Sequence, residues 1–78
     1  MTTWREELKL AMREHGETLD DIVESRGREG WMDIVRGGVP FTAWTKDRVW
    51  FPAMYDGNEW AASAPRNPCD EITKHIGG

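Results

Sequence analysis

The chain has 78 residues, with 14 acidic and 10 basic side chains and a formal net charge of −4. A chain of this length builds one small core, so we expect a single domain over residues 1–78. The acidic balance disfavours nucleic acid as a partner, and no segment approaches the roughly 20 apolar residues of a membrane span. A single cysteine and the lack of a signal-peptide pattern indicate a cytoplasmic protein.

The first helix is predicted by its start signal, its periodicity and its stop signal. Thr3 and Glu6 have the spacing of a capping box, in which each side chain accepts from the other residue's backbone N–H. Gly16 ends the helix, because glycine adopts a left-handed conformation without steric cost. Between them, side chains recur at the spacing of one mainly apolar helical face: Trp4, Leu8, Ala11, Met12 and His15.

A second, shorter helix is expected directly after the first. Thr18 and Asp21 repeat the capping spacing, and Leu19, Ile22 and Val23 supply an apolar side. The two helices together are expected to cover about residues 3–25.

Residues 26–38 are predicted to form an exposed, mobile connection. Residues 26–30 hold two glycines and no apolar anchor. The stretch from Trp31 to Arg36 is open to two interpretations. It is either a short helical turn with Trp31, Ile34 and Val35 directed inward or an irregular segment that closes one end of the core.

A three-stranded antiparallel meander is expected over about residues 40–64, where the apolar period changes to two. Lys46-Asp47 and Asp56-Gly57 are its turn signals, and Asp56-Gly57 suits a type I′ turn, which needs positive φ at both central positions. Pro52 falls in the central strand, where it cannot donate to the ladder, so we expect a bulge there. The predicted fold class is therefore α+β, with two short N-terminal helices packed on the meander.

The aromatic residues of the meander indicate which face of the sheet is buried. We expect the core face, which packs against the helices, to carry Phe41, Val49, Phe51, Tyr55 and Trp60. The opposite face then presents three large side chains to solvent: Trp44, Trp50 and Met54. A bulge at Pro52 would exchange part of these two sets.

An extended tail is expected over residues 65–78, where prolines and glycines leave little length for a helix, with Ile72 and Ile76 as its anchors. Cys69 and His75 are close in sequence, yet a structural metal site needs four ligands and a reactive thiol needs a rigid pocket. We therefore predict no catalytic residue, no metal and no cofactor, and a chain that is not an enzyme.

Two blocks of the sequence carry a resemblance to a known family. One runs from TWREEL at residues 3–8 to DIVE at residues 21–24, and the other is PFTAWTKDRVWFPAMYDGNEW followed by SAPRNP and HIGG. In these blocks, about two thirds of the chain, the sequence resembles small, largely uncharacterised proteins encoded by tailed bacteriophages and prophages. Residues 25–39 depart from the family pattern. The resemblance implies a phage accessory protein made in a bacterial cytoplasm, and it implies no activity.

Protein binding is the predicted function, with a bacterial host or phage protein as the partner. Tryptophan and arginine are enriched in binding hot spots, so we expect the solvent face of the sheet to bind through Trp44, Trp50, Met54, Lys46 and Arg48. Self-association into a homodimer through the same tryptophans is the alternative use of that face. The alternative function is an acidic nucleic-acid mimic, which would present the carboxylates of the N-terminal helices: Glu6, Glu7, Glu14, Glu17, Asp20, Asp21 and Glu24.

Overall fold

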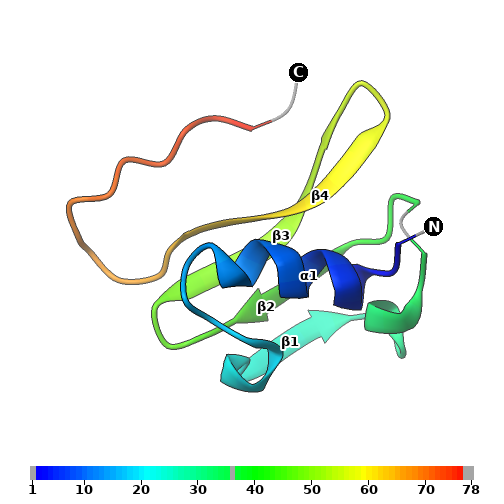
Figure 1. The fold of residues 1–78 in the computed structure, drawn as a ribbon, viewed down its shortest axis with the longest axis horizontal. Helices are drawn as coiled ribbons and strands as arrows, with labels where there is room; N and C mark the ends of the chain where they lie inside the picture. The colour runs from blue at the N-terminus through cyan, green and yellow to red at the C-terminus, as the bar shows by residue number, and fades with distance from the viewer. Residues whose placement is uncertain (1, 36, 77–78) are drawn as a thin grey trace.

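The computed structural model describes residues 2–35 and 37–76. The strands form one antiparallel sheet in the order β1-β2-β3-β4, and α1 lies across one face of it (Figure 1). The fold is therefore α+β, as predicted, but with one α-helix and four strands in place of two helices and three strands. The elements in chain order are α1 (Trp4–Arg13), the 3-10 turn η1 (Leu19–Asp21), β1 (Glu24–Gly27), the 3-10 turn η2 (Trp31–Asp33), β2 (Phe41–Trp44), β3 (Arg48–Tyr55) and β4 (Asn58–Pro65).

The first helix is confirmed together with its signals. The Thr3 side chain accepts from the backbone N–H of Glu6, and the Glu6 carboxylate accepts from the backbone N–H of Thr3. Gly16 follows the helix with φ of +71°. These local signals therefore fix where α1 starts and where the chain turns away from it.

The prediction of a second α-helix is wrong. Asp21 does accept from the backbone N–H of Thr18 at 2.7 Å, but the turn that it caps is only the three-residue η1. The chain then becomes extended, and Glu24–Gly27 pairs with β2 as the edge strand β1. A capping pair marks where a helical turn begins and not how long it continues, and in this chain pairing with β2 ends the helix early.

Part of the predicted connection over residues 26–38 also belongs to regular elements. Of the two interpretations of the stretch after Gly30, the short helical turn is confirmed, because Trp31 begins η2 and is only 6% exposed, but Val35 is 37% exposed, so its expected inward place is wrong. Its ring stacks on Phe41 with centroids 4.2 Å apart. A Cβ atom at Gly27 would lie 2.7 Å from Trp31 Cδ1, so the ring needs a glycine beneath it. Arg36 lies outside the described residues.

The three predicted strands of the meander are present, and the predicted bulge is not. Asp56 and Gly57 both have positive φ, 50° and 80°, as a type I′ turn requires. The β3–β4 register then runs without interruption through Pro52. Tyr55 and Asn58 form the first pair after the turn, and from this pair hydrogen-bonded and non-hydrogen-bonded pairs alternate along the ladder. Pro52 and Ala61 form a non-hydrogen-bonded pair, so the nitrogen of Pro52 points away from β4. The β2–β3 ladder stops before it reaches Pro52, so its missing donor interrupts neither ladder.

The predicted assignment of faces is wrong for β3 and β4. Trp50 lies opposite Ala43, and opposite residues share a face of the sheet. β3 therefore turns its even-numbered side chains toward α1. Phe41 is buried there as expected, but the other expected core residues lie on the opposite face: Val49, Phe51, Tyr55 and Trp60.

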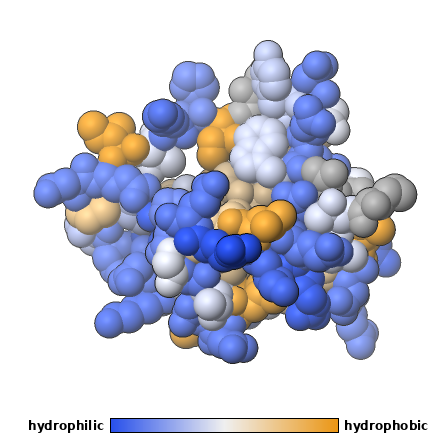
Figure 2. Space-filling view, in the orientation of Figure 1, coloured by the Kyte–Doolittle hydropathy of each residue, from blue (hydrophilic) through white to orange (hydrophobic). Residues whose placement is uncertain are grey.

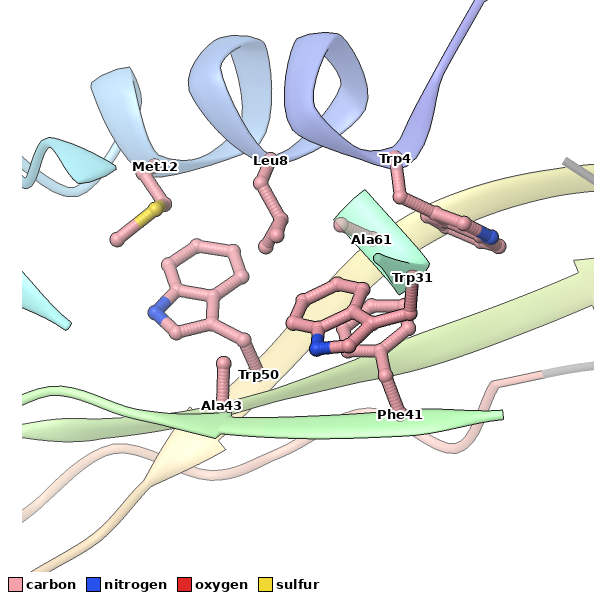
Figure 3. Close-up of a cluster of buried hydrophobic side chains, with 8 residues drawn as sticks. All are labelled: Trp4, Leu8, Met12, Trp31, Phe41, Ala43, Trp50 and Ala61. Atoms are coloured by element: carbon pink, nitrogen blue, oxygen red, sulfur yellow. The ribbon is translucent and has the colours of Figure 1, made fainter. Parts of the chain in front are cut away.

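The core lies between α1 and the sheet (Figure 3). Trp4, Leu8 and Met12 project from α1 and have no exposed surface. The Trp50 ring lies below the helix, close to Met12 and Leu8, while Trp31 covers Phe41 at the other end. Three of the five tryptophans are thus used in the interior, each able to bury about 150–250 Å².

Candidate functional site

The side of the sheet that faces away from α1 carries a continuous apolar strip, which we call the open face, made of Trp44, Val49, Phe51 and Trp60. Trp44 lies directly opposite Val49, and Phe51 is two residues farther along β3. Trp60 lies opposite Ala53, the next β3 position on the same side. All four large side chains are half-buried, so each keeps some surface that solvent reaches.

Several observations indicate that no described helix or strand covers the open face, although residues 71–76 of the tail line a cavity beside Trp60. None of its four residues is among the partly buried side chains that pack against the core. The indole nitrogens of Trp44 and Trp60 make no hydrogen bond within the described chain, and neither is sealed from solvent. The shortest dimension of the molecule is 19 Å, which suits one helix layer on one sheet. The α1 side, in contrast, is mostly hydrophilic (Figure 2).

A polar margin borders the open face along β1. Glu24 lies opposite Trp44, and Arg26 lies opposite Thr42. Arg26 donates to the Glu24 carboxylate at 2.8 Å, as an exposed ion pair. An apolar, aromatic centre with a charged rim is the usual composition of a protein-binding surface.

The structure separates the three predicted surface residues of the sheet. Trp44 lies on the open face, as expected. Trp50 is only 1% exposed, so its predicted place at the surface is wrong. Met54 is 59% exposed, but it lies on the α1 side of the sheet, in a groove beside Val39 and Pro40. Trp44 and Met54 therefore do not form one surface.

The two predicted cations also lie apart from the open face. Lys46 is exposed in the turn between β2 and β3. The expectation that Arg48 is a surface cation is wrong, because this residue is 9% exposed and lies on the α1 side. Its guanidinium is 6.0 Å from the centroid of the Trp50 ring, and its Nε donates to Ser63 Oγ at 2.7 Å.

Sequence reasoning missed a carboxylate that joins the end of α1 to the sheet. One oxygen of Glu17 accepts from Trp50 Nε1 at 2.9 Å, and the other accepts from Thr45 Oγ1 at 2.8 Å. Thr45 is fully buried, and its hydroxyl also accepts from the backbone N–H of Arg48. Trp4, the other fully buried indole, has no acceptor among the described residues. Glu17 therefore satisfies the polar atom of the ring at the centre of the core.

A second missed carboxylate ties the tail to the domain. Glu71 accepts two hydrogen bonds of 2.9 Å from the terminal nitrogens of Arg48. Hydrogen bonding from this guanidinium holds the pKa of Glu71 below its ordinary value, and the same pairing raises the pKa of Arg48. The predicted anchors are wrong, since Ile72 is 90% exposed and Ile76 is 40% exposed. Residues 77 and 78 of the predicted tail lie outside the described residues.

The remaining candidates for chemistry stay apart from one another. Cys69 is an exposed free thiol. His15 is exposed, and its ring lies 5.7 Å from the Trp50 ring, edge to face. Within residues 2–35 and 37–76, no three histidine, cysteine, aspartate or glutamate side chains come together as a metal site would require. The helical segments of the same residues are all too short or too polar to cross a membrane.

The carboxylates of the N-terminal segment differ in their surroundings. Glu6 and Asp21 accept from the backbone at the starts of their turns. Glu17 is turned toward the core and Glu24 is paired with Arg26. At least four of the seven carboxylates of the predicted acidic surface therefore have hydrogen-bond or ion-pair partners within the described chain.

Comparisons of the chain with protein-family models, with curated proteins and with solved structures give no match.

Proposed function

We propose that the protein is a non-catalytic binding module, whose open face docks on a bacterial or phage protein and modulates it. The observation that carries the proposal is that Trp44, Val49, Phe51 and Trp60 lie side by side on the uncovered side of the sheet. Large apolar side chains that gather on a surface are typical of sites where another protein binds. The phage or bacterial source of the partner is supported by the sequence resemblance alone.

Trp44 is the expected centre of the binding energy. Its side chain is large, has its indole N–H free for an acceptor on the partner, and is flanked by Val49 and the charged Glu24. Residues of this kind, surrounded by contacts that exclude water, commonly contribute about 2 kcal/mol or more to binding. Loss of 2 kcal/mol corresponds to a roughly thirtyfold weaker complex.

Trp44→Ala is therefore expected to abolish capture of the partner without loss of the fold. The full-length tagged protein is used to retain partners from a bacterial lysate, and affinity for the recovered partner is then measured. Met54→Ala is the matched control, because Met54 is more exposed than any open-face residue but lies on the other side of the sheet. The wild type and Met54→Ala should bind equally.

Two outcomes would contradict the proposal. Capture that survives Trp44→Ala but is lost in Met54→Ala would place the binding surface on the α1 side. The second outcome is self-association that depends on protein concentration and is lost in Trp44→Ala. In that case a second copy of the chain binds the open face. Sedimentation at two protein concentrations distinguishes this homodimer from a complex with another protein.

A further inference from the structure

A cavity of about 850 Å³ lies between the outer edge of β4 and the tail, on a different part of the molecule from the Trp44–Val49 end of the open face. Asn58, Trp60 and Ser63 line it from β4, and residues 71–76 line it from the tail. The tail passes alongside β4 without joining the sheet (Figure 1). Sites for small molecules and peptides commonly have volumes of about 300–1,000 Å³.

Arg48 lines this cavity, and its side chain is already oriented. Nine tenths of its side chain is buried, its Nε is held by Ser63, and its plane lies near the Trp50 ring. Its two terminal nitrogens are left to form a fork, which matches the two oxygens of a carboxylate. The site is therefore built to receive a carboxylate with no rearrangement of its own.

The present occupant of the fork is held by little else. Between residues 68 and 76 of the tail, Glu71 alone makes hydrogen bonds in the described chain. The next residue, Ile72, is 90% exposed, and residues 66–76 contain no helix or strand. Glu71 thus resembles a tethered ligand more than a packed part of the domain.

The outer edge of β4 is also unpaired among the described strands. β4 is the last strand of the sheet and pairs only with β3. Tyr55 and Asn58 close the β3–β4 turn with hydrogen bonds, so alternate residues such as Ala61 and Ser63 direct their backbone groups outward. An extended peptide can add to such an edge through main-chain hydrogen bonds.

We propose that this cavity binds an extended acidic peptide segment of a partner protein. An aspartate or glutamate of the segment takes the Arg48 fork in place of Glu71, and the segment's backbone lies along β4. Lys74 lines the cavity as a second cation, beside His15 and His75, and the two carboxylates of the cavity are Glu14 and Glu71, the latter being the one that the ligand replaces. This inference goes beyond the open-face function, because it concerns a different class of ligand and a site that shares only Trp60 with the open face.

The test removes the Glu71 carboxylate by substitution and supplies a carboxylate on a separate peptide. Full-length Glu71→Gln keeps the shape of the exposed side chain and loses its charge. The probe is acetyl-Glu-Ile-Thr-Lys-His-Ile-amide, which copies residues 71–76 and carries one carboxylate. Its matched control has glutamine as the first residue. Titration is followed by NMR at the Arg48 Nε–H, the Trp60 indole N–H and the backbone N–H groups of β4.

Glu71→Gln should bind the glutamate probe about tenfold more tightly than the wild type. A tethered carboxylate that fills the fork about nine tenths of the time reduces the apparent affinity by that factor, and this occupancy is the value that the proposal assigns to Glu71. The glutamine probe should bind at least about tenfold more weakly than the glutamate probe. Equal affinity of the two probes, equal affinity of the two proteins, or no binding at several millimolar probe would each overturn the proposal. Sodium acetate serves as a further probe. If acetate binds at Arg48 with the same affinity as the peptide and the β4 signals do not shift, the site binds small carboxylates, and the proposal of a peptide ligand is overturned.

Discussion

Trp50→Ala is expected to lower the free energy of unfolding by about 3–5 kcal/mol, the largest effect of any single substitution in the sheet. The ring is 1% exposed and contacts the underside of α1 beside Leu8 and Met12 (Figure 3). Its removal leaves a cavity that the surrounding side chains fill only in part. Domains below about 80 residues rarely obtain more than roughly 3–5 kcal/mol from their core. The variant should therefore be largely unfolded at 25 °C, as far-UV circular dichroism and urea titration will measure.

Trp44→Ala is the matched control for this substitution. It removes the same side chain from the neighbouring strand, but from the open face, where Trp44 is half-buried and contacts Val49 across the ladder. Cross-strand pairs of this kind contribute about 0.2–1 kcal/mol. Equal losses of stability in the two variants would mean that the two faces of the sheet are buried to the same extent, which would contradict the assignment of Trp50 to the core and Trp44 to the open face.

Glu17→Gln is expected to lower the free energy of unfolding by about 1–3 kcal/mol. The carboxylate accepts from Trp50 on one oxygen and from Thr45 on the other. An amide offers one uncharged oxygen in place of two charged ones, so the indole keeps at most a neutral acceptor, and the Thr45 hydroxyl turns to Arg48 O, 3.3 Å away. Hydrogen bonds to charged groups contribute about 1.5–3 kcal/mol, against about 0.5–1.5 kcal/mol for neutral ones. Urea titration of the variant and the wild type measures the difference.

Glu14→Gln controls for the loss of one negative charge near the same end of α1. Glu14 is exposed, and substitution at such positions commonly changes stability by less than about 0.5 kcal/mol. Trp50→Phe, made in both the wild-type and Glu17→Gln backgrounds, isolates the shared hydrogen bond. The substitution should cost less when Glu17 is already changed. Identical costs in both backgrounds would show that the carboxylate does not stabilise the indole.

The elements that short-range patterns specify were predictable from the sequence. Thr3 with Glu6 gives the start of α1, and Asp56-Gly57 gives the turn between β3 and β4. The strand β1 was not predictable in this way, because the sequence ESRG has no apolar alternation. It is an edge strand that pairs only with β2, and the Trp31 ring packs against its Gly27. Neither the pairing with β2 nor the packing of Trp31 produces a recognisable pattern in the sequence of β1.

The burial of Trp50 was implied by a turn that the sequence does indicate. A two-residue turn at Lys46-Asp47 pairs Thr45 with Arg48, and the backbone N–H of Thr45 indeed donates to Arg48 O at 3.0 Å. Two residues farther along each strand, Ala43 faces Trp50. The prediction of faces failed because it placed odd-numbered residues of both β2 and β3 on the core face, whereas a two-residue turn pairs odd-numbered residues with even-numbered ones. A register error of one residue exchanges the faces of a strand.

The carboxylates that organise the two ends of the domain could not be found from local patterns. Glu17 is 33 residues from Trp50, and Glu71 is 23 residues from Arg48. Each lies in a run of charged or polar residues, where nothing distinguishes a buried hydrogen-bond acceptor from a solvated side chain. The tertiary fold selects them. Arg48, which was predicted to be a surface cation, forms an internal ion pair with Glu71 in the structure.

Hydrogen exchange of the five tryptophan indole N–H groups, measured by NMR on the wild-type protein, tests the separation of the two sheet faces most directly. We predict slow exchange for Trp50, whose N–H is bonded to Glu17, and fast exchange for Trp44 and Trp60, whose N–H groups are unbonded and reached by solvent. If the indole N–H groups of Trp44 and Trp60 exchange as slowly as that of Trp50, another part of the chain covers the open face. That result would contradict the proposed binding surface.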